Sequence, residues 1–290
     1  MTITLENSQL RIAVISKGAE LRSVVRKDNN VEYIWSGDPS VWGKTSPILF
    51  PIVGTLKNDT YIYRDKSYQL PRHGFARDAE FELVSQEQHQ VVFVLKDTSH
   101  SFKNYPFTFE LFVKYLLDND ALKVVYEVRN TGTGPLYFSL GAHPAFKVPL
   151  TQGRSYGDYF LEFNCVENAD RWRINKEGLI ETTPVPFFNN SRRIDLSHEL
   201  FANDALVFKD LSSQKVLLKT QHDAHGLEFY FEGFSFLGLW AAKGGDFVCI
   251  EPWCGIADSV DHDQLLINKE GIQTLSANDI WVRQWKVRYF

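Results

Sequence analysis

The fold class of this chain is decided by one stretch, FTFELFVKYLLDNDALKVVYEV, which spans Phe107–Val128. Every second residue from Phe107 to Leu117 is apolar, and the alternation resumes from Leu122 to Val128. Because successive side chains of a strand point to opposite faces, each half predicts a strand with one buried face. Asp118-Asn119-Asp120, between the halves, carries side chains that favour tight turns. The stretch therefore predicts an antiparallel hairpin.

Strand-like alternation recurs along the rest of the chain, with Gly, Asn, Asp and Ser between many of the segments. Only two short helices are predicted: Pro39–Trp42, with Asp38 as its cap, and Ser197–Phe201, with Ser197 as its cap. Neither is long enough to connect two parallel strands. The further predicted strands are Leu10–Ile15, Leu21–Val25, Phe81–Val84, Val91–Leu95, Leu136–Leu140, Val216–Lys219, Leu227–Phe231 and Trp281–Tyr289.

The composition allows one large core. Of the 290 residues, 44% are hydrophobic and 14% are aromatic, which gives ample side-chain area to bury against the entropy of the chain. No linker-like tract or repeat of fixed period divides the sequence. We therefore expect an all-β protein in which residues 1–290 form a single large antiparallel β-sandwich domain with a few short helices.

Charge and hydropathy argue against several classes of partner. The formal net charge is −5, and no run of Lys and Arg is long enough to follow a phosphodiester backbone, so no nucleic-acid partner is expected. No stretch of about 18 apolar residues occurs, which argues against a membrane-spanning helix. The residues after Met1 lack the features of a secretory signal, so a cytoplasmic location is expected. The pattern leaves open whether the chain is a monomer or a homodimer.

Metal ligands occur only in weak patterns. Cys249 and Cys254 are spaced C-x4-C, but no second pair of ligands completes a zinc set. The clusters His222–His225 and Asp261–Asp263 have the composition of polar loops. No G-x-S-x-G, Walker A or dinucleotide-binding glycine pattern is present. We expect neither a metal nor another cofactor.

Three short segments far apart in the chain each carry one proton-handling side chain: His73 lies in PRHGFAR, His143 in GAHPAF, and Glu251 in IEPW at the end of an apolar strand. Imidazole titrates near neutrality and a carboxylate accepts a proton from a hydroxyl, so the three together would form an acid/base set. Pro144 restricts His143 to extended conformations, and Gly74 lets the backbone beside His73 approach a ligand closely. We interpret the three as candidate catalytic residues.

The order of four motifs resembles that of one family. PRHGFAR (residues 71–77), GAHPAF (141–146), NDALVF (203–208) and VCIEPW (248–253) follow one another as in the aldose 1-epimerase (galactose mutarotase) family, and its LacX-like branch in particular. The likeness runs from Ser8–Glu20 to KEGIQTL (269–275) and the last predicted strand. It implies a large antiparallel β-sandwich with a sugar cleft on one sheet, and a hexose or hexose phosphate as the partner.

By position in these motifs, the resemblance assigns a role to four residues. His143 matches the histidine that protonates the ring oxygen of the sugar, and Glu251 matches the base that removes the anomeric proton. His73 matches the histidine that supports the ring-oxygen side, and Asp204 matches the carboxylate that binds sugar hydroxyls. The implied activity is the interconversion of the α and β anomers of a hexose by ring opening and closure.

One departure from the family pattern bears on the substrate. Where many galactose mutarotases have Asn-Arg-Ile, this chain has GTL (54–56), so Thr55 stands where the family has a substrate-binding arginine. Arg72 and Arg77 are candidates to take over that role.

Three aromatic residues lie beside the motifs: Phe75, Phe146 and Trp253. They either stack on the C–H face of the sugar or belong to the core. We count Phe146 and Trp253 among the candidate substrate-binding residues.

Two other interpretations remain open. Arg72, Arg77 and Lys57 either bind the phosphate of a hexose 6-phosphate or are ordinary surface cations. A noncatalytic sugar-binding or sensory protein would use the same fold.

Overall fold

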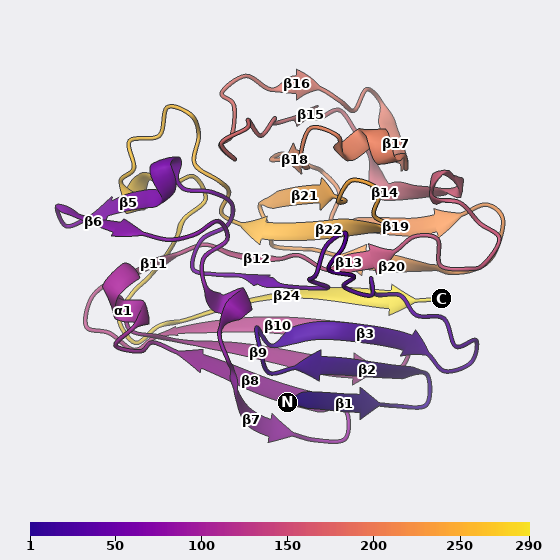
Figure 1. The fold of residues 1–290 in the computed structure, drawn as a ribbon, viewed down its shortest axis with the longest axis horizontal. Helices are drawn as coiled ribbons and strands as arrows, with labels where there is room; N and C mark the ends of the chain where they lie inside the picture. Colours follow the sequence, from indigo (N-terminus) through magenta and orange to yellow (C-terminus); the bar gives the residue numbers. More distant parts are fainter.

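A computed structural model describes residues 1–290, and Figure 1 shows a molecule built almost wholly of strands. The strands are β1 (Thr2–Glu6), β2 (Leu10–Ile15), β3 (Glu20–Arg26), β4 (Ile48–Leu49), β5 (Thr60–Tyr63), β6 (Lys66–Gln69), β7 (Glu82–Gln86), β8 (Gln90–Lys96), β9 (Phe109–Asp118), β10 (Ala121–Asn130), β11 (Leu136–Phe138), β12 (Leu140–Ala142), β13 (Ala145–Lys147), β14 (Tyr159–Glu167), β15 (Asp170–Arg171), β16 (Val185–Pro186), β17 (Ser191–Asp195), β18 (Leu206–Phe208), β19 (Lys215–Thr220), β20 (Gly226–Tyr230), β21 (Phe236–Trp240), β22 (Phe247–Cys254), β23 (Gln273–Leu275) and β24 (Ile280–Tyr289). The helices are the single-turn α1 (Ser101–Asn104) and the 3-10 helices η1 (Lys57–Asp59), η2 (Ala76–Asp78), η3 (Tyr156–Asp158), η4 (His198–Phe201) and η5 (Leu266–Asn268). None of them has the length and apolar character that crossing a membrane requires.

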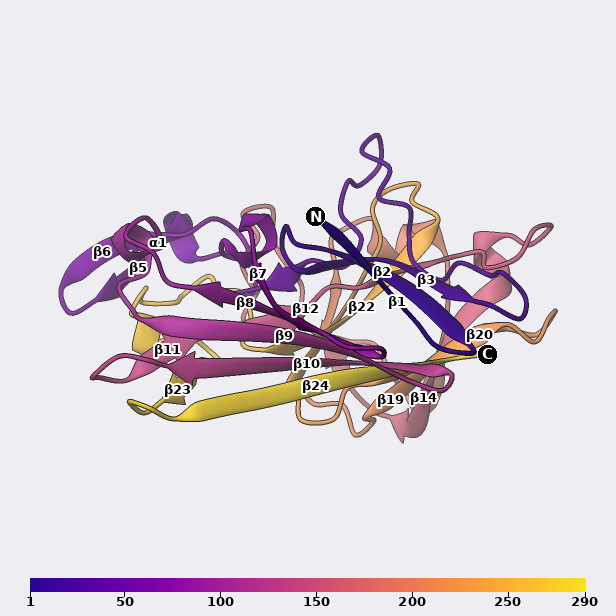
Figure 2. The same ribbon diagram turned by 90° about the horizontal axis from the view of Figure 1, so that it is seen from below.

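The largest sheet has nine antiparallel strands in the order β17-β14-β19-β20-β24-β10-β9-β8-β7. The predicted hairpin lies near its middle: β9 pairs with β10, and Leu117 lies opposite Leu122 beside the turn. Alternate residues of β9 are buried, as the period-two pattern predicts. Figure 2 shows β24, β10 and β9 side by side.

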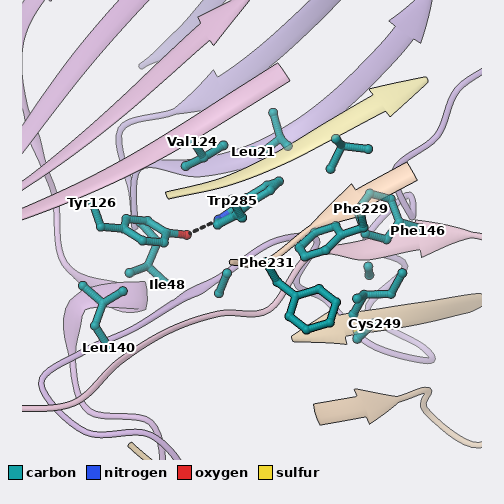
Figure 3. Packing of buried hydrophobic residues seen from close by; sticks show 14 of the residues in the cluster. Leu21, Ile48, Val124, Tyr126, Leu140, Phe146, Phe229, Phe231, Cys249 and Trp285 are labelled. Atoms are coloured by element: carbon teal, nitrogen blue, oxygen red, sulfur yellow. Dashed lines mark hydrogen bonds between the residues drawn. The ribbon is translucent and has the colours of Figure 1, made fainter. Parts of the chain in front are cut away.

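A second sheet runs in the order β18-β21-β22-β12-β4, and β13 also pairs with β22. Strands of both sheets contribute to one core of 69 buried residues. Inside this core Nε1 of Trp285 donates a hydrogen bond to the hydroxyl of Tyr126 at 3.0 Å (Figure 3), so each aromatic side chain satisfies the polar atom of the other. The predicted all-β class and the large antiparallel sandwich are confirmed.

The predicted strands agree with the observed ones within two residues at each end, with one exception. The predicted strand Leu136–Leu140 is two strands, β11 and β12, separated at Ser139. The backbone N–H of Ser139 donates to the carbonyl of Pro51 at 2.7 Å, so it takes its hydrogen bond from a loop. The apolar run gives no sign of this break, because β11 and β12 both have buried side chains although they pair with different strands.

The predicted helical turn at Pro39–Trp42 is present as a turn over Pro39–Val41, but it is not a helix. The carbonyl of Asp38 accepts the N–H of Trp42 at 2.8 Å, and the Asp38 carboxylate accepts the N–H of Ser40 at 2.9 Å. The cap is therefore present, but no run of helix-forming residues follows to extend the turn.

The predicted helix Ser197–Phe201 is the 3-10 helix η4, whose first residue is His198. The short α1 was not predicted. Thr98 and Ser101 exchange hydrogen bonds before it, with the Thr98 N–H donating to Ser101 Oγ at 2.8 Å and the Ser101 N–H donating to Thr98 Oγ1 at 3.0 Å. One turn held by such local bonds carries no helical periodicity that a sequence pattern could show.

Candidate active site

The candidate active site is built on β22, which is buried along its whole length. Its two ends pair with β12 and β13, but between these strands the pairing has a gap, in which Ala142 lies opposite Pro252 and His143 lies opposite Glu251. Because Pro252 has no N–H to donate, the gap leaves no unpaired donor on that residue. Glu251 therefore lies inside a strand and not at a strand end, and it faces His143.

His143 and Glu251 form a buried pair. Nε2 of His143 lies 3.3 Å from Oε2 of Glu251, and the two residues are 7% and 2% exposed. Burial raises the pKa of Glu251 well above its ordinary value, and the positive charge of Arg72 offsets only part of this effect. Burial lowers the pKa of His143 to about 3. Both shifts favour the uncharged form of the pair, in which Glu251 carries the proton and His143 is neutral.

His73 is held in a left-handed backbone conformation, with φ 70°, followed by Gly74 with φ 71°. A Cβ on Gly74 would lie 2.3 Å from the carbonyl oxygen of Phe50, so only glycine fits there. The close approach predicted for Gly74 is thus to the backbone of Phe50 and not to a ligand. Non-glycine residues with positive φ store strain, and such strain gathers at functional sites.

The proton of neutral His73 is fixed on Nε2. The N–H of Gly54 donates to Nδ1 of His73 at 3.1 Å, so Nε2 carries the hydrogen. Nε of Arg72 lies farther away, 3.4 Å from Nε2, and cannot donate to a protonated nitrogen. Burial lowers the pKa of His73 well below its ordinary value, and the neighbouring His143 adds to this effect. The ring centroids of the two histidines are 5.9 Å apart.

Trp253 lies flat against the sheet next to Glu251. A Cβ on Gly141 in β12 would lie 2.5 Å from Cδ1 of Trp253, and a Cβ on Gly238 in β21 would lie 2.4 Å from Cη2. The two glycines on the neighbouring strands therefore make room for the two ends of the indole. The ring forms part of the floor beside the carboxylate.

These side chains surround a hollow of about 300 Å³, which is at the small end of the range for small-molecule sites. Seven of the eight residues that we proposed for the site from the sequence line it: His73, His143, Glu251, Asp204, Arg72, Arg77 and Trp253. The spatial gathering of the two histidines and the carboxylate is therefore present in the structure.

Phe146 does not line the hollow and its proposed place in the substrate site is wrong. It is fully buried in the core, where its ring lies 5.8 Å from that of Phe229 (Figure 3). Phe75 also packs inside the molecule, 6.1 Å from the ring of Tyr105. Neighbouring residues of a strand point to opposite faces, so closeness to His143 in sequence does not bring Phe146 to the hollow.

Arg72 and Asp204 form an ion pair at the more exposed part of the hollow. Nη2 of Arg72 lies 3.4 Å from Oδ1 of Asp204, and the two side chains are 43% and 26% exposed. Asp204 also has a positive φ, 75°, and accepts the N–H of Ala205 at 2.7 Å. A partly exposed pair of this kind contributes little to stability, so its polar atoms remain available to a ligand.

Arg77 lies in the wall of the hollow with its Nε buried and without a hydrogen-bond partner. Oδ2 of Asp78 is 3.6 Å away, too far for a hydrogen bond, and burial lowers the pKa of the Arg77 guanidinium. Thr55, at the position of the family arginine, does not line the hollow, although its neighbour Gly54 does. Lys57 is also outside it, and its Nζ donates to the carbonyl of His262 at 3.1 Å.

Among the residues of the hollow that the sequence did not indicate, Trp42 and Trp240 contact His143. The ring of Trp42 stacks on His143 with centroids 5.0 Å apart, and the edge of Trp240 approaches the same imidazole at 5.7 Å. Neither belongs to a motif, and in a chain with 7 Trp the residue type alone gives no signal. They fix the orientation of His143 from two sides.

The comparison with known proteins gives the class of this protein, a carbohydrate isomerase, and its family. Residues 1–264 match the family model described as aldose 1-epimerase, so the chain belongs to the aldose 1-epimerase family. The resemblance stated from the motifs is confirmed.

Relatives with a known sequence or structure agree with this assignment. The chromosomal protein LacX of Lactococcus lactis subsp. lactis is 36% identical over 278 residues, which cover 93% of each chain. The structure of a galactose mutarotase related enzyme from Lactobacillus acidophilus has a TM-score of 0.96 at 34% identity, covering 100% of this chain and 97% of that one. A galactose mutarotase-like protein from Lactobacillus casei ATCC 334 has a TM-score of 0.94 at 31% identity, with 100% of both chains covered.

Proposed function

We propose that this protein interconverts the α and β anomers of a free hexose, with Glu251 as the base at the anomeric hydroxyl and His143 as the acid at the ring oxygen. The observation that carries this proposal is the 3.3 Å contact between the two side chains at the hollow. A pair that shares one proton can give a proton to one oxygen of the sugar and take a proton from another.

The pair of Glu251 and His143 has an ion-pair state that suits ring opening and a neutral state that suits ring closure. Transfer of the proton from the Glu251 carboxyl to Nε2 of His143 gives a carboxylate beside an imidazolium. The imidazolium protonates O5, the carboxylate takes the proton of O1, and the C1–O5 bond breaks to give the open aldehyde. Glu251 is then protonated and His143 neutral, which is the state that ring closure requires.

Ring closure reverses these transfers after rotation about C1–C2. Glu251 returns its proton to the carbonyl oxygen, His143 takes the proton of the O5 hydroxyl, and the new C1–O5 bond forms on the other face. The protons balance over the cycle without a further reagent. Each positioned acid or base contributes roughly 10²–10⁴-fold, which is adequate for a reaction that already proceeds in water.

Unpaired polar atoms around the hollow support a ligand with several hydroxyl groups. Buried side-chain atoms without a hydrogen-bond partner include Nδ1 of His143, Nε1 of Trp253 and Nε of Arg77. Since buried polar groups are normally paired, a sugar would supply the missing partners. We assign the Nε2–H of His73 to the ring-oxygen side and the carboxylate of Asp204 to sugar hydroxyls.

Polarimetry on freshly dissolved α-galactose and α-glucose tests this proposal. We expect the protein to accelerate the relaxation of optical rotation, and His143→Ala to remove at least about 99% of the acceleration. His198→Ala, which changes a histidine outside the hollow, is the matched control and should behave as the wild-type protein. Tight sugar binding without acceleration would instead indicate a noncatalytic sugar-binding protein.

A hexose 6-phosphate is the second candidate substrate, and the Arg77 guanidinium, whose buried Nε has no hydrogen-bond partner, favours it. Arg77 and Arg72 both line the hollow, and guanidinium groups bind phosphate through paired hydrogen bonds. Comparing kcat/KM for glucose and glucose 6-phosphate separates the candidates. If phosphate is bound, Arg77→Gln lowers kcat/KM for the phosphorylated sugar more than for the free sugar.

A further inference from the structure

Cys249 lies close to the acid/base pair and has no part in the reaction proposed above. It precedes Glu251 by two residues in β22, so both side chains leave the same face of the strand. One ligating atom each from His143, Cys249 and Glu251 lies within 4.8 Å of the other two, and all three residues are buried. Imidazole, thiolate and carboxylate are the ligands that Zn²⁺ takes in proteins.

The spacing of these atoms is close to that of a tetrahedral metal site. Nitrogen and oxygen ligands about 2.05 Å from Zn²⁺ at a tetrahedral angle are about 3.3 Å apart. His143 Nε2 and Glu251 Oε2 are 3.3 Å apart without any movement. A sulfur ligand at about 2.3 Å from the metal would lie about 3.6 Å from each of them, so from within 4.8 Å the thiol of Cys249 needs a shift of at most about 1.2 Å. That shift is within reach of a rotation of one side chain.

We propose that His143, Cys249 and Glu251 form a site for Zn²⁺ whose fourth position opens into the hollow, and that the metal inhibits the protein. Binding replaces two protons, the thiol proton of Cys249 and the proton shared by Glu251 and His143, and both go to solvent without any change of oxidation state. The metal occupies the lone pairs through which the pair moves protons. The inhibitory effect rests on the proposed function, whereas the binding does not.

The same strand supplies a matched control. Cys254 is also buried, but it lies an odd number of residues from Glu251 and so leaves the other face of β22, where its Sγ lies 3.8 Å from the carbonyl of Gly233. Replacing Cys254 removes a thiol of equal burial from the same strand without touching the cluster. Sequence spacing pairs Cys249 with Cys254, whereas the fold pairs it with His143 across a gap of more than 100 residues.

Metal binding is tested on chelator-treated protein with Zn²⁺ by calorimetry and with Co²⁺ by absorption. We expect one Zn²⁺ per chain and a thiolate-to-cobalt charge-transfer band in the wild-type protein and in Cys254→Ser. Cys249→Ser should lose the band and bind Zn²⁺ at least about tenfold more weakly. Even the loss of a residue that only hydrogen-bonds to a metal ligand lowers metal affinity about 10–100-fold. Cys249→Ala, of similar volume, serves if the serine variant does not fold.

Activity gives the second readout. Zn²⁺ should slow anomer exchange in the wild-type protein and in Cys254→Ser at concentrations that do not affect Cys249→Ser. Without metal, the three proteins should exchange the anomers at the same rate. Equal Zn²⁺ affinity in wild-type protein and both Cys249 variants, or a cobalt spectrum without the thiolate band, overturns the proposal. If the protein accelerates no anomer exchange, the proposed function fails but the binding experiments still decide the metal site.

Discussion

Nζ of Lys269 lies 2.8 Å from Oδ1 of Asp258, and neither side chain has any exposed surface. The other carboxylate oxygen of Asp258 accepts the backbone N–H of Lys57 at 2.9 Å, and the N–H of Asp258 donates to the carbonyl of Thr55 at 3.0 Å. A buried ion pair thus fixes the backbone that follows Gly54 at the wall of the hollow. The ion pair thereby helps to hold Gly54, whose N–H donates to Nδ1 of His73 and so places the proton of that histidine on Nε2.

Breaking this ion pair should be costly. Burial lowers the pKa of Lys269 even beside Asp258, which indicates that desolvation of the ammonium group outweighs its attraction to the carboxylate. Lys269→Met leaves a buried carboxylate without its cation, so the free energy of unfolding should fall by about 3–5 kcal/mol in urea denaturation. The double variant Lys269→Met/Asp258→Asn should regain part of this loss, because no buried charge remains. A single-variant loss below about 1 kcal/mol would contradict this account.

Asp258 should make the fold sensitive to acid. Burial alone would raise the pKa of Asp258, but the neighbouring His262 and the charge and hydrogen bond of Lys269 outweigh it and hold the value at about 2. Because this folded-state pKa is below the ordinary value of 3.8, its stabilisation is complete above about pH 4 and is lost as pH falls toward 2. The expected loss is about 2 kcal/mol, from about 1.4 kcal/mol per pKa unit.

Urea denaturation of the wild-type protein and Asp258→Asn at pH 6, 4 and 2 checks this prediction. The variant starts less stable and should lose less stability than the wild-type protein between pH 4 and 2. Parallel losses in the two proteins would show that other carboxylates govern the acid response.

Trp42 should act through His143. Its ring stacks on the imidazole at 5.0 Å, and an aromatic pair of this kind contributes about 0.5–1.5 kcal/mol. Trp42→Ala should therefore lower kcat/KM for anomer exchange by about 2- to 10-fold, and Trp42→Phe should restore most of it. Trp281→Ala, outside the hollow, is the control. Equal kinetics in Trp42→Ala and the wild-type protein would remove Trp42 from the site.

The strands could be predicted from the sequence because burial on one face imposes a period of two, as in Phe109–Asp118. The seven correctly placed residues of the hollow could be predicted because His73, His143, Asp204 and Glu251 lie in motifs with a family order. What local pattern cannot give is the partner of each strand. The gap between β12 and β13 that brings His143 to Glu251 depends on pairings with β22 across about 100 residues.

The errors have the same origin. Phe146 is next to a motif in sequence, but the face it takes is set by the packing of the core against Phe229. Trp42 and Trp240 reach the hollow through tertiary contacts that no motif records. A side chain that caps a turn also caps a helix, so the Asp38 carboxylate alone does not distinguish a turn from the start of a helix.

The most direct test of the central claim is exchange NMR between the two anomers of a hexose at equilibrium, with wild-type protein and Glu251→Gln. The substitution keeps the shape of the side chain and removes the proton-accepting carboxylate, while Glu228→Gln, a carboxylate on β20, serves as the control. We expect faster exchange with the wild-type protein and the control, and at least about 100-fold less acceleration with Glu251→Gln. Undiminished exchange by a folded Glu251→Gln protein would contradict the central claim.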